Sequence, residues 1–210
     1  MKRIMIVEDD PMASQLLEIY IKGHKEYELV CSIENASMAE VYCLSQKIDL
    51  ILMDVCTAMN ASGLDAAKKI KKNFPDIKII IITSQPECSF IDRAREAGVD
   101  SFWYKSSKAD EIISVIEKTF SGEKIYPDTT PTLELGDALS VDLSDRELEV
   151  LRELVSGKTD AEIAEKLFMS VRTVKSHITS LKNKTGFKNR TELAVRAREV
   201  GLVINDKRTE

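Results

Sequence analysis

Acidic residues follow two of the apolar segments in the first half of the chain. Glu8 and Asp9 come directly after "RIMIV" (residues 3–7), and Asp54 ends "DLILMD" (residues 49–54). Carboxylates that lie close together repel one another, so some of them must take up protons or a cation. Oxygen ligands with several acids suit Mg²⁺, which usually keeps some waters and works beside a phosphate. The acids therefore predict a magnesium site that handles a phosphoryl group.

Two more polar residues stand at the ends of apolar segments. Thr83 ends "KIIIIT" and Lys105 ends "SFWYK". Taken singly, each has an ordinary explanation, as a β-branched strand residue and a solvated lysine. In an open parallel sheet, however, ligands gather beyond the carboxyl ends of the strands. Acid, acid, hydroxyl and ammonium at four such ends indicate one site.

The elements that must position these residues alternate along the first 120 residues. Short segments of nearly continuous apolarity predict parallel strands covered on both faces, at 3–7, 27–33, 49–53, 78–83 and 101–105. Helical patterns lie between and after them, near 11–23, from about 37, and near 63–73, 86–97 and 108–121. The order predicts an α/β fold, a doubly wound five-stranded parallel sheet over residues 1–120.

The remaining residues have a different organisation. Residues 121–142 contain Gly, Pro and Thr in a stretch typical of a linker. Residues 143–205 show only helical patterns, and four capping signals predict a small all-α domain. The paired residues are Ser144 with Glu147, Thr159 with Glu162, Ser170 with Thr173, and Asn189 with Glu192.

Charge is distributed unevenly between these two parts. Residues 1–142 hold 16 Lys and Arg against 24 Asp and Glu, whereas residues 143–210 hold 14 against 11. Between Lys166 and Thr191 there are seven basic residues and no acid. This contrast indicates two domains with different partners.

The second helix of a close pair, expected at 171–184, has an apolar side and a basic side. We expect Val171, Val174, Ile178 and Leu181 to face the core. The other side displays Arg172, Lys175, Ser176, Thr179 and Lys182. Such a face suits the major groove of double-stranded DNA. The alternative, a solvated helix that binds nothing, is disfavoured by the absence of acids.

Contacts to DNA phosphates give affinity and salt dependence rather than sequence preference. Arg172, Thr173, Lys182 and Lys184 are best placed to make them.

Composition excludes several other classes. No segment approaches the roughly 18 apolar residues of a membrane span, and the N-terminus has too short an apolar run for a signal peptide. The cysteines stand singly at 31, 43, 56 and 88, which favours reduced thiols over disulfides or zinc. We therefore expect a cytoplasmic protein without a membrane partner.

Residues 1–120 resemble a response-regulator receiver domain, with a flavodoxin-like fold. The motifs are "IMIVEDDP", "LILMDV", "IIIITS" and "SFWYK". The resemblance implies that Asp54 takes a phosphoryl group from a sensor histidine kinase. It also implies that Mg²⁺ is bound by Asp9, Asp54 and the backbone carbonyl of Cys56, with Glu8 acting through water.

The same resemblance assigns three further roles. Thr83 would hydrogen-bond the phosphoryl group, and Lys105 would pair with its oxygens. Phe102 would be the switch aromatic, filling space that Thr83 vacates. The sequence departs from the family in the loop at 55–63, where Thr57-Ala58 replaces Met-Pro and Gly63 comes one residue late. We expect the loop to alter kinase docking and phosphoryl lifetime.

The second domain resembles the LuxR-type helix-turn-helix, in "LSDRELEVLREL", "GKTDAEIAEKLFMSVRTVKSHI" and "LKNKTGFKNRTELAV". Together the two domains resemble the NarL/FixJ family of response regulators. This implies a transcription factor that is controlled by phosphorylation and forms a homodimer when active, with RNA polymerase as a candidate partner. The resemblance places dimerisation on the last helix, through Leu193, Ala194, Ala197 and Val200.

Two other functions compete with this one. An aspartate-nucleophile phosphohydrolase would need a second acid two residues after Asp54, and Cys56 occupies that position. The chain is therefore not expected to be a turnover enzyme. A DNA-binding regulator that no longer uses phosphorylation is the closer alternative, because the 55–63 loop is atypical.

Overall fold

Five parallel strands form the sheet of the first unit, in the order β2-β1-β3-β6-β7. Their bounds are β1 Lys2–Val7, β2 Tyr27–Ile33, β3 Leu50–Asp54, β6 Lys78–Thr83 and β7 Ser101–Tyr104. The central strands are completely buried along almost their whole length, as their continuous apolarity predicts. The predicted five-stranded parallel sheet is confirmed.

This computed structural model describes residues 1–87, 89–105, 111–128 and 130–203. The chain forms two units, Met1–Ser84 with Ser89–Thr129, and Gln85–Cys88 with Thr130–Glu210. Cys88 and the predicted helical residues 108–110 lie outside the described residues.

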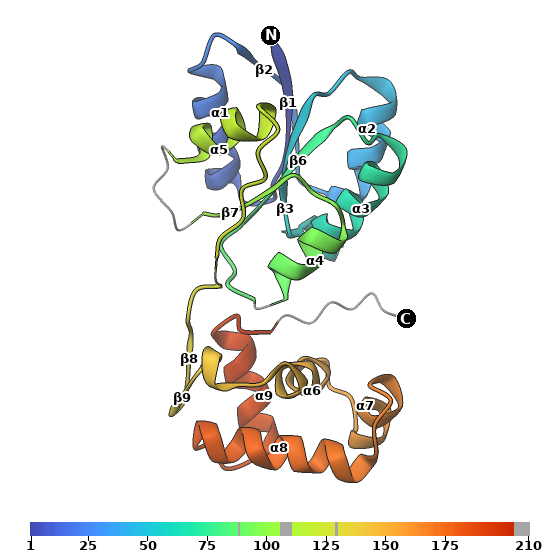
Figure 1. Ribbon diagram of the computed structural model, residues 1–210, viewed down its shortest axis with the longest axis vertical. Coiled ribbons are helices and arrows are strands. Elements are labelled where there is room, and N and C mark those ends of the chain that lie inside the picture. Colours follow the sequence, from blue (N-terminus) through green and yellow to red (C-terminus); the bar gives the residue numbers. More distant parts are fainter. Residues whose placement is uncertain (88, 106–110, 129, 204–210) are drawn as a thin grey trace. The chain divides into compact units, whose positions relative to one another are not determined.

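Helices cover both faces of the sheet, as the doubly wound fold requires (Figure 1). Helices α1 (Pro11–Lys22) and α5 (Glu111–Phe120) lie on one face. The other face carries α2 (Ala39–Ser45), α3 (Gly63–Asn73) and α4 (Phe90–Glu96). Short 3-10 turns, η1 (Ala36–Met38) and η2 (Ala58–Asn60), precede α2 and α3.

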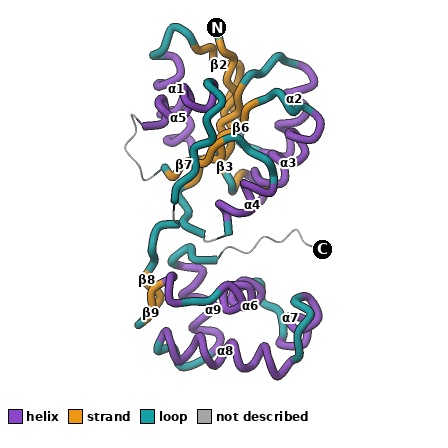
Figure 2. Tube along the Cα trace, in the orientation of Figure 1, coloured by secondary structure: helices purple, strands orange, loops and turns teal. Residues whose placement is uncertain are grey.

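The described residues of the second unit include the four α-helices α6 to α9, which Figure 2 shows in purple. They are α6 Asp145–Val155, α7 Asp160–Lys166, α8 Val171–Thr185 and α9 Arg190–Glu199. Each begins at a predicted cap, where the side chain of Ser144, Thr159, Ser170 or Asn189 accepts a backbone N–H. The cap stabilises the first turn by satisfying an otherwise unpaired donor. None of the helices in the described part of the chain is both long and apolar enough to cross a bilayer.

Much of the predicted linker, 121–142, is structured. Strands β8 (Glu134–Leu135) and β9 (Ala138–Leu139) form a hairpin that buries Leu135 and Ala138 in the core of the second unit. The turn η3 (Ser140–Asp142) follows directly. At the other end, the backbone of Ile125 is hydrogen-bonded to the first unit. The stretch that connects the units is thus shorter than composition indicates.

The last helix, α9, carries the four residues through which dimerisation was predicted. Leu193 and Ala197 are completely buried in the core of the second unit, and Ala194 and Val200 pack against that core. Leu193 and Ala197 therefore have no exposed surface for a second copy, whereas contact through Ala194 and Val200 stays a prediction. The spacing of three and four in this set marks the core-facing side of the helix.

Candidate functional site

Three carboxylates converge at the carboxyl ends of β1 and β3. One oxygen each from Glu8, Asp9 and Asp54 lies within 4.8 Å of the others. Glu8 and Asp54 are buried, whereas Asp9 is exposed. Asp10 has another task, since its side chain accepts from the N–H groups of Met12 and Ala13 and caps α1.

The ammonium of Lys105 lies between two of these acids. Its Nζ is 2.5 Å from Glu8 Oε2 and 3.0 Å from Asp54 Oδ2. The Lys105 N–H donates to the carbonyl of Thr83 at 2.8 Å, which ties the residue after β7 to the end of β6. The sheet thus brings together residues that are up to about a hundred positions apart in the sequence. The ion pair with Glu8 was not foreseen, because pairing depends on rotamers that sequence does not specify.

Burial and charge set the ionisation of this cluster. Burial raises the pKa of Asp54 to about 7; the charge of Lys105 opposes the rise, and that of Glu8 adds to it. Burial by itself would lower the pKa of Lys105, but Asp54 and Glu8 hold it above its ordinary value. Asp54 therefore needs nearby positive charge to be a carboxylate, and three acids outnumber one ammonium.

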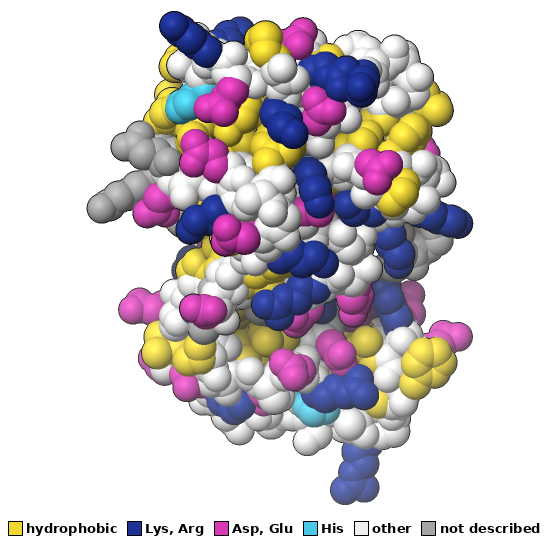
Figure 3. Space-filling model, turned by 45° about the horizontal axis from the view of Figure 1, so that its top comes forward, with side chains coloured by type: hydrophobic (Ala, Val, Ile, Leu, Met, Phe, Trp, Pro, Cys, Tyr) yellow, Lys and Arg dark blue, Asp and Glu magenta, His cyan; other side chains and the backbone are white. Residues whose placement is uncertain are grey.

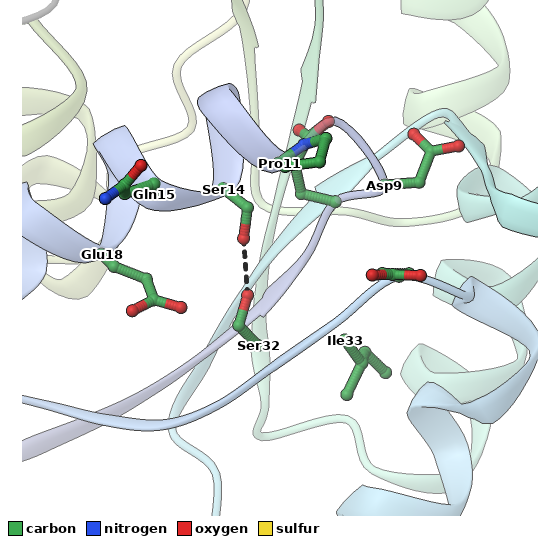
Figure 4. Close-up of a pocket in the computed structure, with 9 residues that line it drawn as sticks. Asp9, Pro11, Ser14, Gln15, Glu18, Ser32 and Ile33 are labelled. Carbon is green, nitrogen blue, oxygen red and sulfur yellow. Dashed lines mark hydrogen bonds between the residues drawn. The ribbon is translucent and has the colours of Figure 1, made fainter.

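The donor set fits a divalent cation. Carboxylate oxygens are hard ligands of the kind that Mg²⁺ prefers, and the cluster carries uncompensated negative charge. A hollow of about 270 Å³ opens beside it, lined by Glu8 and Asp9 and by residues of α1 and β2. In Figure 4 the hydroxyls of Ser14 and Ser32 meet across this hollow, 2.7 Å apart. The hollow opens the Glu8 and Asp9 side of the cluster to solvent.

Thr83 and Phe102, the predicted switch pair, are both buried, with 1% of each residue exposed. Thr83 follows Ile82, which pairs with Asp54 across the β3–β6 ladder. The ring of Phe102 packs edge-on against that of Tyr104, with centroids 5.0 Å apart. Phe102 thus already occupies the interior.

The atypical loop after Asp54 forms a small hairpin. Strands β4 (Cys56–Thr57) and β5 (Ala61–Ser62) pair antiparallel, with Cys56 opposite Ser62. The hydroxyl of Thr57 donates to the Ala61 carbonyl at 2.7 Å and accepts from the Ala36 N–H at 3.0 Å. The additional residue is therefore absorbed by ordered structure.

The hairpin returns to the phosphoacceptor strand at Gly63. Its N–H donates to the Val55 carbonyl at 2.8 Å, and a Cβ at this position would lie 1.8 Å from the Asp54 carbonyl oxygen. Only glycine allows this approach. A glycine is thus required where the loop rejoins the strand, although it comes one residue late.

Helix α8 of the second unit presents the predicted polar face. Val174, Ile178 and Leu181 are buried, whereas Val171, expected in the core, is 41% exposed. The residues predicted to contact DNA lie on the other side: Arg172, Thr173, Lys175, Ser176 and Thr179 are exposed and Lys182 is half-buried. Figure 3 shows basic and acidic side chains interspersed on the face in view, without a large patch of one sign.

Hydrogen bonds distinguish the members of this face. The hydroxyls of Thr173 and Ser170 are 2.7 Å apart, and Thr179 donates to the Lys175 carbonyl at 2.8 Å. Lys184 turns away from the others, because its Nζ lies 2.8 Å from Glu147 Oε2 and donates to the Asp142 carbonyl at 2.9 Å. The predicted phosphate contact of Lys184 receives no support from this geometry.

Two family models match the chain. Residues 4–117 match the response regulator receiver domain, and residues 141–197 match the bacterial regulatory proteins of the luxR family. The chain therefore belongs to the response regulators, as a LuxR-type member of the NarL/FixJ kind.

Individual proteins share this domain order over nearly their full length. The response regulator protein VraR of Staphylococcus epidermidis is 28% identical over 206 residues, covering 96% of this chain and 98% of the relative. The fimbriae Z protein of Escherichia coli K12 is 28% identical over 196 residues, covering 90% and 93%.

Solved structures share the fold. RcsB of Salmonella enterica serovar Typhimurium, bound to promoter P1flhDC in the presence of the phosphomimetic BeF3⁻, has a TM-score of 0.64 at 20% identity, covering 94% of this chain and 98% of that one. A structure of two RcsB dimers bound to two parallel DNAs has a TM-score of 0.64 at 21% identity, covering 95% and 98%.

Proposed function

We propose that this response regulator binds double-stranded DNA under the control of phosphorylation at Asp54 by a sensor histidine kinase. The observation that carries the proposal is the position of the Lys105 ammonium between Asp54 and Glu8. It lies at the carboxyl ends of the strands, where Asp9 and Thr83 also lie. Each group has a distinct task in phosphoryl transfer.

The nucleophile is a carboxylate oxygen of Asp54. It attacks the phosphorus of the donor, a P–O bond to Asp54 forms, the P–N bond to the kinase histidine breaks, and the histidine leaves. Lys105 neutralises charge on the phosphoryl oxygens, and the Thr83 hydroxyl donates a hydrogen bond to one of them. The product is an acyl phosphate on the protein itself, so the chain is not a turnover enzyme.

Glu8, Asp9 and Asp54 are the residues that would hold Mg²⁺, with the Cys56 carbonyl as a further candidate ligand. When bound, the ion supplies positive charge at the phosphoryl oxygens. The protein's own contribution is to keep two buried acids and one exposed acid within reach of one another. Their mutual repulsion makes the pocket favourable for a cation.

For DNA we assign contacts with base edges to Lys175, Ser176 and Thr179, and phosphate contacts to Arg172, Thr173 and Lys182. The exposed positions of the first turns of α8 support this assignment, since a recognition helix reads bases mainly from its N-terminal part. We assign Lys184 to the fold of the domain. We infer a cytoplasmic location, because a regulator of this kind must reach DNA. We infer that the chain forms homodimers, as RcsB does on DNA, and that RNA polymerase is a further partner.

Incubation of the full chain with acetyl phosphate and Mg²⁺ is expected to add one phosphoryl group, because Asp54 is a buried carboxylate beside Lys105. Intact-mass measurement reads the gain, and Asp54→Ala removes the nucleophile. Absence of the gain in the wild type, or an equal gain in Asp54→Ala, would contradict the proposal. If neither the phosphodonor nor Asp54→Ala changes the affinity for DNA, the result would favour a phosphorylation-independent regulator.

Arg172→Gln is expected to reduce the salt dependence of DNA binding by about one unit of logarithmic slope, because one phosphate contact is lost. Lys184→Gln is expected to leave the slope unchanged, since its ammonium is held by Glu147. Fluorescence anisotropy with a mixed-sequence duplex pool over a salt series measures both. A larger slope change for Lys184→Gln than for Arg172→Gln would reverse the assignment.

A further inference from the structure

The outer edge of β7 is occupied by residues that follow α5. Strand β7 is the last in the sheet order, so one side of its backbone has no strand partner among the five. On that side the Phe102 N–H donates to the Ile125 carbonyl at 2.7 Å. The Ile125 side chain packs against the hydrophobic core of the first unit. We call residues 123–126 the edge segment.

A directed chain of hydrogen bonds joins the edge segment to α5. The Ile125 N–H donates to Ser101 Oγ at 3.1 Å, and Thr119 Oγ1 donates to the Val115 carbonyl at 2.6 Å. Ser101 and Thr119 hydroxyls are 2.7 Å apart and completely buried. Because the Thr119 hydroxyl hydrogen already bonds to Val115, the Ser101 hydroxyl must be the donor to Thr119 Oγ1. The order is therefore Ile125, Ser101, Thr119, Val115, and such chains strengthen each bond within them.

Tyr126 provides a second anchor. Its hydroxyl donates to the Val99 carbonyl at 2.8 Å, and the Arg95 guanidinium lies 5.1 Å from the centre of its ring. Arg95 belongs to α4, and Val99 lies between α4 and β7. The Tyr126 anchor therefore connects the edge segment to α4. The edge segment is thus held at adjacent residues by both backbone and side-chain contacts.

The same short strand meets the phosphoacceptor site at its other end. Lys105 directly follows β7 and contacts Asp54, and Phe102 lies three residues earlier. We propose that the edge of β7 is a docking surface for the chain's own edge segment, and that phosphorylation of Asp54 weakens this docking through β7. The coupling rests on the proposed function. New phosphoryl oxygens would draw Lys105 toward them and shift the strand whose Phe102 N–H holds Ile125.

Release of the edge segment would lengthen the connection to the second unit. Leu133 is already bonded to Ser140 in the second unit, through both its N–H and its carbonyl. With the edge segment docked, residues 127–132 connect the anchored parts; with it released, residues 123–132 do so, because Ser121 and Gly122 remain hydrogen-bonded to the end of α5. At roughly 3.4 Å per extended residue, the maximum reach rises from about 20 Å to about 34 Å. A longer reach changes the effective concentration of one domain near the other's partner.

Amide hydrogen exchange of the full chain tests the docking. Acetyl phosphate with Mg²⁺ is expected to speed exchange of the Phe102 and Ile125 amides about tenfold. Tyr126→Phe removes only the anchoring hydroxyl. Without any phosphodonor, it is expected to speed exchange of the same two amides about fivefold, which corresponds to the loss of one hydrogen bond. Tyr42→Phe on α2 is the matched control and is expected to leave them unchanged. Intact mass of each sample reports phosphorylation.

The outcomes separate the two proposals. A mass gain with unchanged exchange overturns the coupling while leaving the proposed function in place. Equal exchange in Tyr126→Phe and Tyr42→Phe overturns the docking. Absence of a mass gain overturns the proposed function and the coupling with it, while the comparison of the two tyrosine variants still decides the docking.

Discussion

Replacement of Lys105 by glutamine is expected to slow phosphorylation of Asp54 by acetyl phosphate about 100-fold. Lys105 Nζ is 3.0 Å from the nucleophilic carboxylate and is the cation that balances part of its charge. Without it, the phosphoryl oxygens lose a charged partner in the transition state. The pKa of Asp54 should also rise, because Lys105 opposes the effect of burial. Both changes lower the rate.

Single-turnover labelling followed by intact mass measures this effect. Lys72→Gln on the exposed side of α3 removes the same charge away from the site and is expected to leave the rate unchanged. Circular dichroism checks that the receiver remains folded, because Glu8 loses its ion pair in Lys105→Gln. A rate within threefold of the wild type would show that Lys105 has no part in the transfer.

Replacement of Glu147 by glutamine is expected to destabilise the second unit by about 3 kcal/mol. Burial would raise the pKa of Glu147, but the Lys184 ammonium, the Ser144 backbone and hydroxyl, and the Ser180 hydroxyl hold it at about 2. Only 4% of the residue is exposed. An amide in its place cannot accept all of these bonds and leaves Lys184 without its counter-charge.

The same shift predicts how stability depends on pH. The folded pKa of Glu147 is lowered, so its contribution is fully present above the ordinary glutamate value of about 4.3 and is lost as pH falls toward 2. We therefore expect the free energy of unfolding of the second unit, measured with urea between pH 7 and pH 2, to fall less steeply with decreasing pH in Glu147→Gln than in the wild type. Glu149→Gln, on the same helix and paired with Arg146 at the surface, is the control. Equal acid sensitivity in the two variants would contradict the assignment.

Sequence was sufficient for local features because their causes are local. The apolar runs at 49–53 and 78–83 are strands because both faces of the sheet bury them. Ser144, Thr159, Ser170 and Asn189 cap helices because their side chains satisfy nearby N–H groups. The convergence of Glu8, Asp54 and Lys105 followed from a rule about parallel sheets, which places ligands beyond the carboxyl ends of the strands.

Tertiary structure decided the features that depend on distant partners. Leu193 and Ala197 have the spacing of an interface, but only the packing of four helices shows that they face the domain's own core. Lys184 has the position of a phosphate contact, but its ammonium is held by Glu147, 37 residues earlier.

The same division holds in the receiver. Composition marks residues 121–142 as a linker, whereas hydrogen bonds from Phe102 and to Ser101 fix Ile125 on the sheet edge. The sequence by itself determined the periodicity, the caps and the acids that could bind a cation, because each depends on neighbours in the chain. The tertiary structure decided which charges pair and which apolar faces are covered. Both depend on residues that are distant in the sequence and whose contacts exclude water.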